Sequence, residues 1–163
     1  NNIEWINDYF AADVVTAEPT FDLIFSNYVY HWFEQKEAAV KLTSHCLKPG
    51  GRFAIQFVYG LPECLLLIRE MVNKPFELPA NLREQWLDYV DKAGLIYEIK
   101  SDVVPYYHPD VDDLLAWYEG TTHGVVKRAD LTESQLKTLY QKYPGELYVD
   151  HQTLRLVGSK PKA

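Results

Sequence analysis

The sequence lacks the features that mark several large classes of protein. No apolar run approaches the roughly 20 residues that span a bilayer, and the first residues show no signal-peptide pattern. Positive charge is scarce as well, since 16 Lys and Arg stand against 23 Asp and Glu, for a net charge of −7. That balance leaves no basic footprint for nucleic acid. We therefore expect neither a membrane nor a nucleic acid as partner.

Cysteine is almost absent too. Cys46 and Cys64 have no metal-binding spacing, and we interpret them as two buried thiols, so no metal site is predicted. Few cysteines are typical of a reducing compartment, and we expect a cytoplasmic location. The sequence also contains no G-x-S-x-G, no P-loop and no H-E-x-x-H, which argues against other α/β enzymes that use those motifs.

What the sequence does contain is a strand, a turn, a helix, a turn and a second strand. Residues 21–25 are a short, mostly apolar run, typical of a strand buried in a parallel sheet. Residues 47–51, Leu-Lys-Pro-Gly-Gly, end the helix between, and residues 52–59 alternate apolar and polar. Two strands joined by a helix should be parallel, with a right-handed crossover, so the fold class predicted is α/β.

These residues carry a resemblance. Phe-Asp-Leu-Ile-Phe-Ser-Asn (residues 21–27), then His31-Trp32, a helix and Leu-Lys-Pro-Gly-Gly resemble the middle of a class I S-adenosylmethionine-dependent methyltransferase. The most similar members are the small-molecule carboxylate methylators of the trans-aconitate, malonyl-carrier-protein and juvenile-hormone-acid type. The resemblance implies a Rossmann-like sheet of order 3-2-1-4-5-7-6, S-adenosylmethionine as cofactor and a small-molecule acceptor, with a carboxylate oxygen as the methylated group.

One family feature is missing. A complete member begins with a strand, a glycine-rich loop E/D-x-G-x-G-x-G and a helix, then a second strand, yet no G-x-G occurs in this sequence. We therefore expect residues 1–163 to be a single partial methyltransferase domain, the C-terminal two-thirds, inactive alone. The alternative is a degenerate, non-catalytic methyltransferase-like module that pairs with another chain. In either case the strand at residues 21–25 should expose an apolar edge, which a dimer partner or an N-terminal segment would cover.

The resemblance also implies a set of site residues, none of them catalytic. Cofactor contacts fall after two strands, where ligands of open α/β sheets bind: Asp8, Tyr9, Ser26, Asn27, Tyr28 and His31. Acceptor contacts are expected from aromatic rings and imidazoles with polar tips: Trp32, Tyr59, Tyr107, Trp117 and His123, with Tyr106 beside them. Plainer interpretations stay open, namely a solvated turn for Asp8, a structural hydrogen bond for His31, and ordinary packing or exposure for the aromatic rings.

The rest of the sequence agrees with this order of elements. Helices are predicted over residues 61–71, 81–93 and 109–119, and Thr132-Glu-Ser-Gln135 is a capping box that starts another. A strand is predicted over residues 95–103. Residues 146–150 and 153–159 should be extended, the second as an antiparallel strand inserted between the family's strands five and six. Acidic residues near 110–113 complement a helix start and need no ion.

Overall fold

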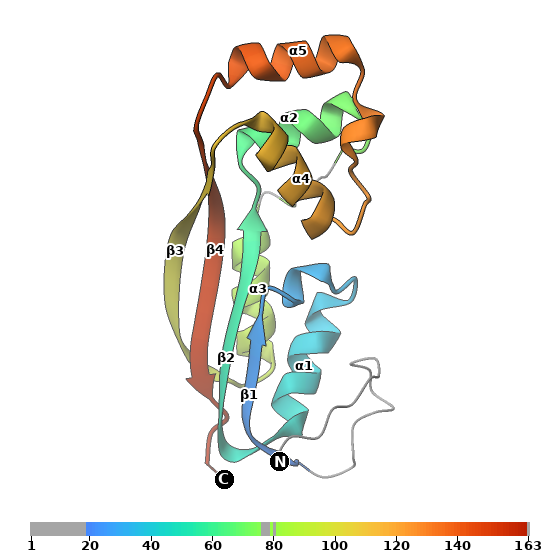
Figure 1. Ribbon diagram of the computed structural model, residues 1–163. Helices are drawn as coiled ribbons and strands as arrows, with labels where there is room; N and C mark the ends of the chain where they lie inside the picture. Colours follow the sequence, from blue (N-terminus) through green and yellow to red (C-terminus); the bar gives the residue numbers. More distant parts are fainter. Residues whose placement is uncertain (1–18, 76–78, 80, 163) are drawn as a thin grey trace, which may run out of the picture. The chain divides into compact units, whose positions relative to one another are not determined.

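The computed structural model describes residues 19–75, 79 and 81–162 (Figure 1). The chain divides into two compact units. Unit 1 contains the described residues 19–59, 81–101 and 154–162, and unit 2 contains residues 60–75, 79 and 102–153. Asp8 and Tyr9 lie outside the described residues.

The strands form a sheet in the order β1-β2-β4-β3. Their bounds are Phe21–Asn27 for β1, Leu47–Gly60 for β2, Leu147–Ser159 for β4 and Ile96–His108 for β3. β1 pairs parallel to β2, as predicted, and the arrow of β4 points the opposite way (Figure 1). This is the order expected of strands four, five, seven and six, with the last strand inserted between its two predecessors.

The turn before β2 depends on its glycines. Gly50 has φ +78, a left-handed conformation that glycine adopts without steric cost. A Cβ on Gly51 would lie 2.8 Å from the carbonyl oxygen of Lys48 and 3.0 Å from that of Phe21. Strand β2 includes this turn, so it starts at Leu47 and not at residue 52. The pairing register between β1 and β2 shifts between Phe21 and Leu23.

The core of unit 1 lies on one face of β2. Phe53, Ile55 and Phe57 alternate along the strand and are buried. The fully buried Trp86 of helix α3 (Leu82–Lys92) packs on Phe57, with ring centroids 4.4 Å apart. Helix α1 (Lys36–Cys46) joins the same layer, since Ser44 donates a hydrogen bond to the Ala93 carbonyl just past α3. Burial of each large apolar side chain stabilises the unit by about 1.5–3 kcal/mol.

The face of β1 that carries Leu23 and Phe25 is exposed within the described part of the chain. Leu23 is 61% exposed and Phe25 72% exposed, and both lie on the strand that ends the sheet order. Their register partners on β2 are Arg52 and Ala54, which share that face. The apolar, exposed character expected of this strand is thus present, and what covers it stays a prediction.

Unit 2 is built from helices packed around a second apolar cluster. Its helices are α2 (Glu63–Met71), α4 (Val111–Thr121), the short η2 (Arg128–Asp130) and α5 (Glu133–Lys142). The buried side chains come from all three longer helices and from β4, and they include Leu65, Ile68, Leu114, Leu115, Leu139 and Val149. The predicted capping box is confirmed, because Thr132 and Gln135 exchange both reciprocal hydrogen bonds at the start of α5.

Two strand predictions were wrong in extent. β3 does not end near residue 103 but continues to His108, through Pro105. Proline is tolerated there because β3 ends the sheet order, and an edge strand can do without one ladder donor. β4 is one strand where two extended stretches were expected. Among the described helices, none combines the length and apolar character that crossing a membrane requires.

Candidate functional site

The turn after β1 is held in an unusual backbone conformation. Tyr28 has φ +55, a region that costs a side-chain-bearing residue about 1–2 kcal/mol. Its backbone N–H donates to the Gln56 carbonyl on β2 over 2.7 Å, so the sheet itself holds the turn. Ser26 before it is half-buried and Asn27 is exposed. Backbone strain of this kind gathers at functional sites, which makes this turn a candidate site.

Tyr30 anchors the residues that follow. It is buried, its hydroxyl hydrogen-bonds the Thr43 hydroxyl of α1, and its ring centroid lies 6.1 Å from that of Trp86. Burial raises the pKa of this phenol, so it stays protonated. Tyr30 belongs to a separate 3-10 turn, η1 (Tyr30–Trp32). His31 and Trp32 therefore precede the long helix α1, which begins only at Lys36.

Three rings gather at this end of β1, and we call them the β1-end cluster: Tyr28, His31 and Trp32. The His31 ring centroid lies 4.9 Å from that of Trp32 and 6.5 Å, edge to face, from that of Tyr28. Trp32 is 51% exposed, so it offers a ring face to solvent rather than to the core. The Tyr28 hydroxyl is buried with no hydrogen-bond partner among the described residues. Tyr59 is half-buried at the end of β2.

The predicted acceptor residues of unit 2 differ in their exposure and in the residues that they contact. Tyr107 is exposed, donates its hydroxyl to Glu146 over 3.1 Å and lies with its ring 5.5 Å from that of Tyr148. His123 is exposed just past α4, with φ +50. Trp117 lies elsewhere, half-buried on α4 among other rings. Tyr107, Trp117 and His123 thus have different immediate neighbours, and their role as acceptor contacts stays a prediction.

Trp117 instead belongs to a cluster that sequence reasoning missed, which we call the imidazole cluster: Tyr106, His108, Trp117 and His151. The Trp117 ring centroid lies 5.4 Å from that of Tyr106, 5.2 Å from His108 and 5.4 Å from His151. Tyr106 meets His151 edge to face at 5.2 Å. Tyr106 and His108 share one face of β3 by strand alternation, a signal that becomes readable once the strand is extended to His108.

The two imidazoles of this cluster differ in their partners. His108 is 3% exposed, and its Nδ1 lies 2.8 Å from an Asp113 carboxylate oxygen at the start of α4. His151 is 6% exposed. Burial, followed by the neighbouring His108, lowers the pKa of His151, and Asp150 opposes that shift. His151 is therefore held in its neutral form.

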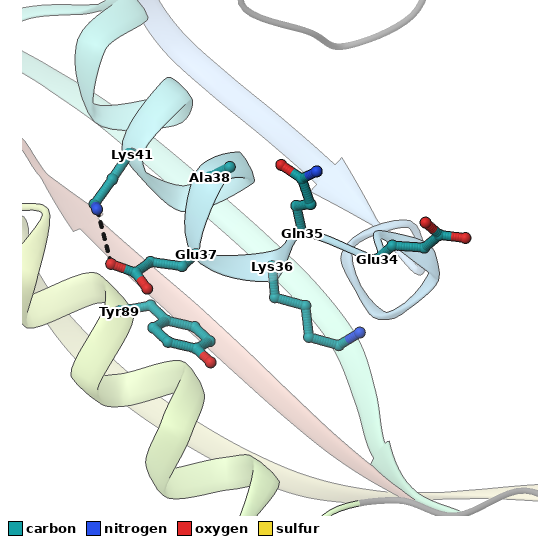
Figure 2. Close-up of a pocket in the computed structure, with 7 residues that line it drawn as sticks. All are labelled: Glu34, Gln35, Lys36, Glu37, Ala38, Lys41 and Tyr89. Atoms are coloured by element: carbon teal, nitrogen blue, oxygen red, sulfur yellow. Dashed lines mark ion pairs between the residues drawn. The ribbon is translucent and has the colours of Figure 1, made fainter.

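Figure 2 shows a hollow at the start of α1, where several of the charged side chains are already paired or hydrogen-bonded. Glu37 and Lys41 form an i,i+4 ion pair at 2.8 Å. Lys36 donates to the Phe33 carbonyl over 2.7 Å, and partial burial lowers its pKa. Tyr89 of α3 lines the hollow too, but none of the predicted site residues does. We assign no function to it.

Metal ligands are not grouped in the part of the chain that the structure describes. No set of three or more His, Cys, Asp or Glu residues there is arranged to hold an ion. Cys46 and Cys64 are free, buried thiols, and burial raises the pKa of both.

Comparison with known proteins gives the context for this geometry. A sequence profile described as a methyltransferase domain matches residues 5–55, which is less than a third of the chain and includes β1, α1 and the turn between them. Among solved structures, the YcgJ protein of Bacillus subtilis is similar, with a TM-score of 0.59 and 16% identity over 91% of this chain and 67% of that chain. The fold is that of the class I methyltransferases.

Other structures with this methyltransferase fold agree. A candidate methyltransferase of Bacillus halodurans gives a TM-score of 0.56 and 13% identity, covering 90% of this chain and 73% of that one. The arsenic(III) S-adenosylmethionine methyltransferase of Chlamydomonas reinhardtii gives 0.50 and 15%, covering 95% and 43%. At these identities the likeness concerns the fold. No curated protein matches the chain significantly.

Proposed function

We propose that this protein serves methyl transfer from S-adenosylmethionine to a small molecule, with a carboxylate oxygen as the methylated group. The observation that carries the proposal is the methyltransferase-domain match across β1 and its strained turn at Tyr28. The sheet order β1-β2-β4-β3 supports it, because the turn then lies at the carboxyl end of a parallel strand, where ligands of open α/β sheets bind.

The residues at that turn have chemistry that suits the cofactor. The β1-end cluster offers ring faces, and Ser26 and Asn27 offer backbone and side-chain hydrogen bonds to the methionine part. Asp8 would accept a hydrogen bond from the adenine amino group, and the Tyr9 backbone N–H would meet a ring nitrogen. The chain contributes position and exclusion of water rather than a reacting group.

No general base is required for this acceptor. A carboxylate is already ionised near neutral pH, so its oxygen bonds to the methyl carbon while the carbon–sulfur bond breaks and its electron pair stays on sulfur. The products are a methyl ester and S-adenosylhomocysteine, and no proton moves. Trp32, Tyr59, Tyr107, Trp117 and His123 remain the proposed acceptor contacts.

Cofactor contact can be tested by saturation-transfer NMR with S-adenosylhomocysteine, which detects weak ligands. We expect saturation to reach the adenosine protons in the wild-type chain and to fall in Trp32→Ala, which removes an exposed ring of the β1-end cluster. His45→Ala, an exposed change on α1, is the matched control. Absence of saturation in the wild-type chain would contradict the proposal.

The acceptor class needs its own assay. Labelled methyl transfer to a panel of small carboxylic acids should give a base-labile product, because esters hydrolyse in alkali. Label that resists alkali would place the methyl group on nitrogen or on a hydroxyl oxygen and would overturn the carboxylate assignment.

A second function is favoured by two observations. The sequence contains no G-x-G loop, and Leu23 and Phe25 expose an apolar strand at one end of the sheet order. A non-catalytic methyltransferase-like module that pairs with another chain through this strand would explain both. Light scattering of the purified chain should show a dimer, or an affinity purification should retain a longer methyltransferase with it. A monodisperse monomer without cofactor affinity would count against this alternative and the main proposal together.

A further inference from the structure

The imidazole cluster of unit 2 holds more unsatisfied polar atoms than its packing explains. His108 Nε2, His151 Nδ1 and His151 Nε2 are all buried, and none finds a hydrogen-bond partner among the described residues. Buried polar groups in folded proteins are rarely left unpaired, and exceptions gather where a ligand or an ordered water is held. Three such atoms in one cluster therefore indicate a binding site.

The hydrogen-bond character of these atoms follows from their neighbours. A carboxylate only accepts hydrogen bonds, so in the neutral form of His108 the proton lies on Nδ1, toward Asp113, and Nε2 presents a lone pair. His151 is held neutral, so it presents one donor and one acceptor. The three buried nitrogens thus offer two lone pairs and one N–H, and the complementary group is rich in hydrogen-bond donors.

Two aromatic rings, those of Tyr106 and Trp117, surround the imidazoles. Tyr106 and Trp117 lie within 5.4 Å of the His151 ring, centroid to centroid, and Trp117 also flanks His108. Flat aromatic walls around a few polar atoms are typical of small-molecule sites. The charged groups nearby are Asp113, from α4, and Asp150, beside His151 on β4.

We propose that the imidazole cluster binds a small molecule through an O–H or N–H group, with His108 Nε2 as the principal acceptor and Asp113 as the residue that positions it. The inference rests on the proposed function for the identity of that molecule, which would be a methyl acceptor carrying a hydroxyl or an amine besides its carboxylate. The binding chemistry itself rests on unit 2.

A bound water is the competing explanation. The two nitrogens of His151 lie on different edges of its ring, so satisfying both and His108 Nε2 takes either several waters or one ligand with more than one polar atom. Imidazole nitrogen chemical shifts distinguish the cases, because they report protonation and hydrogen bonding at each ring nitrogen.

The test is a titration of the full ¹⁵N-labelled chain, observed at its imidazole nitrogens, with three probes. Ethanolamine and 1,2-propanediol carry donors, and acetate carries none. We expect the donor probes to shift His108 Nε2 and His151 saturably, with acetate about tenfold weaker. Ring nitrogens that already show hydrogen-bonded shifts without a probe, and that no probe moves, would overturn the proposal in favour of water.

Variants sharpen this test. His108→Leu should abolish the response of His151 to ethanolamine, while Lys137→Leu, an exposed change in the same unit, should leave it intact. Asp113→Asn keeps a polar partner but can donate to Nδ1, which moves the His108 proton to Nε2. The preference should then reverse from ethanolamine to acetate, a result that a merely structural pair would not give. An unchanged preference would contradict the positioning role.

The outcome is separable from that of the proposed function. Probe binding at the imidazoles in a chain that fails to bind S-adenosylhomocysteine would leave this site standing and overturn the methyltransferase proposal. Cofactor binding with silent imidazoles would do the reverse.

Discussion

The two units differ in how far their polar aromatic groups are exposed. In unit 1 the buried Tyr30 hydroxyl is hydrogen-bonded to Thr43, and the exposed Trp32 lies where water reaches it. In unit 2 His108 and His151 are almost fully buried, with ring nitrogens that lack partners among the described residues. Unit 1 has buried atoms unpaired within the described chain as well, the Tyr28 hydroxyl and Trp86 Nε1, so the contrast lies in exposure: unit 1 presents an exposed ring at a turn, and unit 2 presents two buried imidazoles that a ligand can satisfy.

The largest difference in stability is expected between substitutions of two tryptophans, Trp86 in the unit 1 core and Trp117 in the imidazole cluster. Trp86→Ala removes a fully buried ring from the unit 1 core and should lower the free energy of unfolding by about 3–5 kcal/mol. Trp117→Ala, at a half-buried position, should cost clearly less. Urea unfolding followed by circular dichroism measures both, and equal losses would contradict the contrast.

Two tyrosine hydroxyls give the next contrast. Tyr118 accepts a 2.6 Å hydrogen bond from Nε of the buried Arg69 in unit 2, so Tyr118→Phe should cost about 1–3 kcal/mol. The Tyr28 hydroxyl has no partner within the described chain, so Tyr28→Phe should be neutral or slightly stabilising. The same unfolding experiment compares them, and a destabilised Tyr28→Phe would show that its hydroxyl is satisfied.

A smaller difference in stability is expected from the helix caps of the two units. Thr132 caps α5 through its side chain, and Thr132→Ala should cost about 1 kcal/mol. Asn81 stands at the same position of α3 in unit 1 but makes no side-chain cap bond, so Asn81→Ala should change stability much less. If thermal unfolding shows the two losses to be equal, the capping geometry is not what stabilises α5.

The pH dependence should come from unit 2. The pKa of His151 is lowered on folding, so the unfolded chain binds the proton more readily. Its contribution is therefore present above the unfolded pKa near 6.5 and is lost as the pH falls below that value. Among neighbouring titratable groups, His108 lowers the pKa of His151 further and Asp150 opposes that shift. His151→Phe should flatten the slope of stability between about pH 7.5 and 5.5, and a wild-type slope in that variant would refute the assignment.

Much of the fold could be predicted from local signals. The Pro-Gly-Gly turn, the alternation of Phe53, Ile55 and Phe57 and the capping box at Thr132 each act over a few residues, and each is present in the structure. The end of β3 could not be predicted, because Pro105 normally argues against a strand and is tolerated here only by an edge position, which depends on the whole sheet.

The candidate site was less predictable for the same reason. Ser26 to Tyr28 could be proposed because they follow a strand directly. Tyr30 was missed because its role depends on Thr43 and on Trp86, far away in sequence. The imidazole cluster joins β3, α4 and β4, so His108 and His151 become neighbours of Trp117 only after the unit has folded.

The most direct test of the central claim is a calorimetric titration of the chain with S-adenosylmethionine. Because the sequence carries no G-x-G loop, we expect weak but saturable binding near the millimolar range, about −4 kcal/mol, that is lost in Trp32→Ala and kept in His45→Ala. An absence of heat, or binding that is indifferent to Trp32, would contradict a cofactor site at the end of β1.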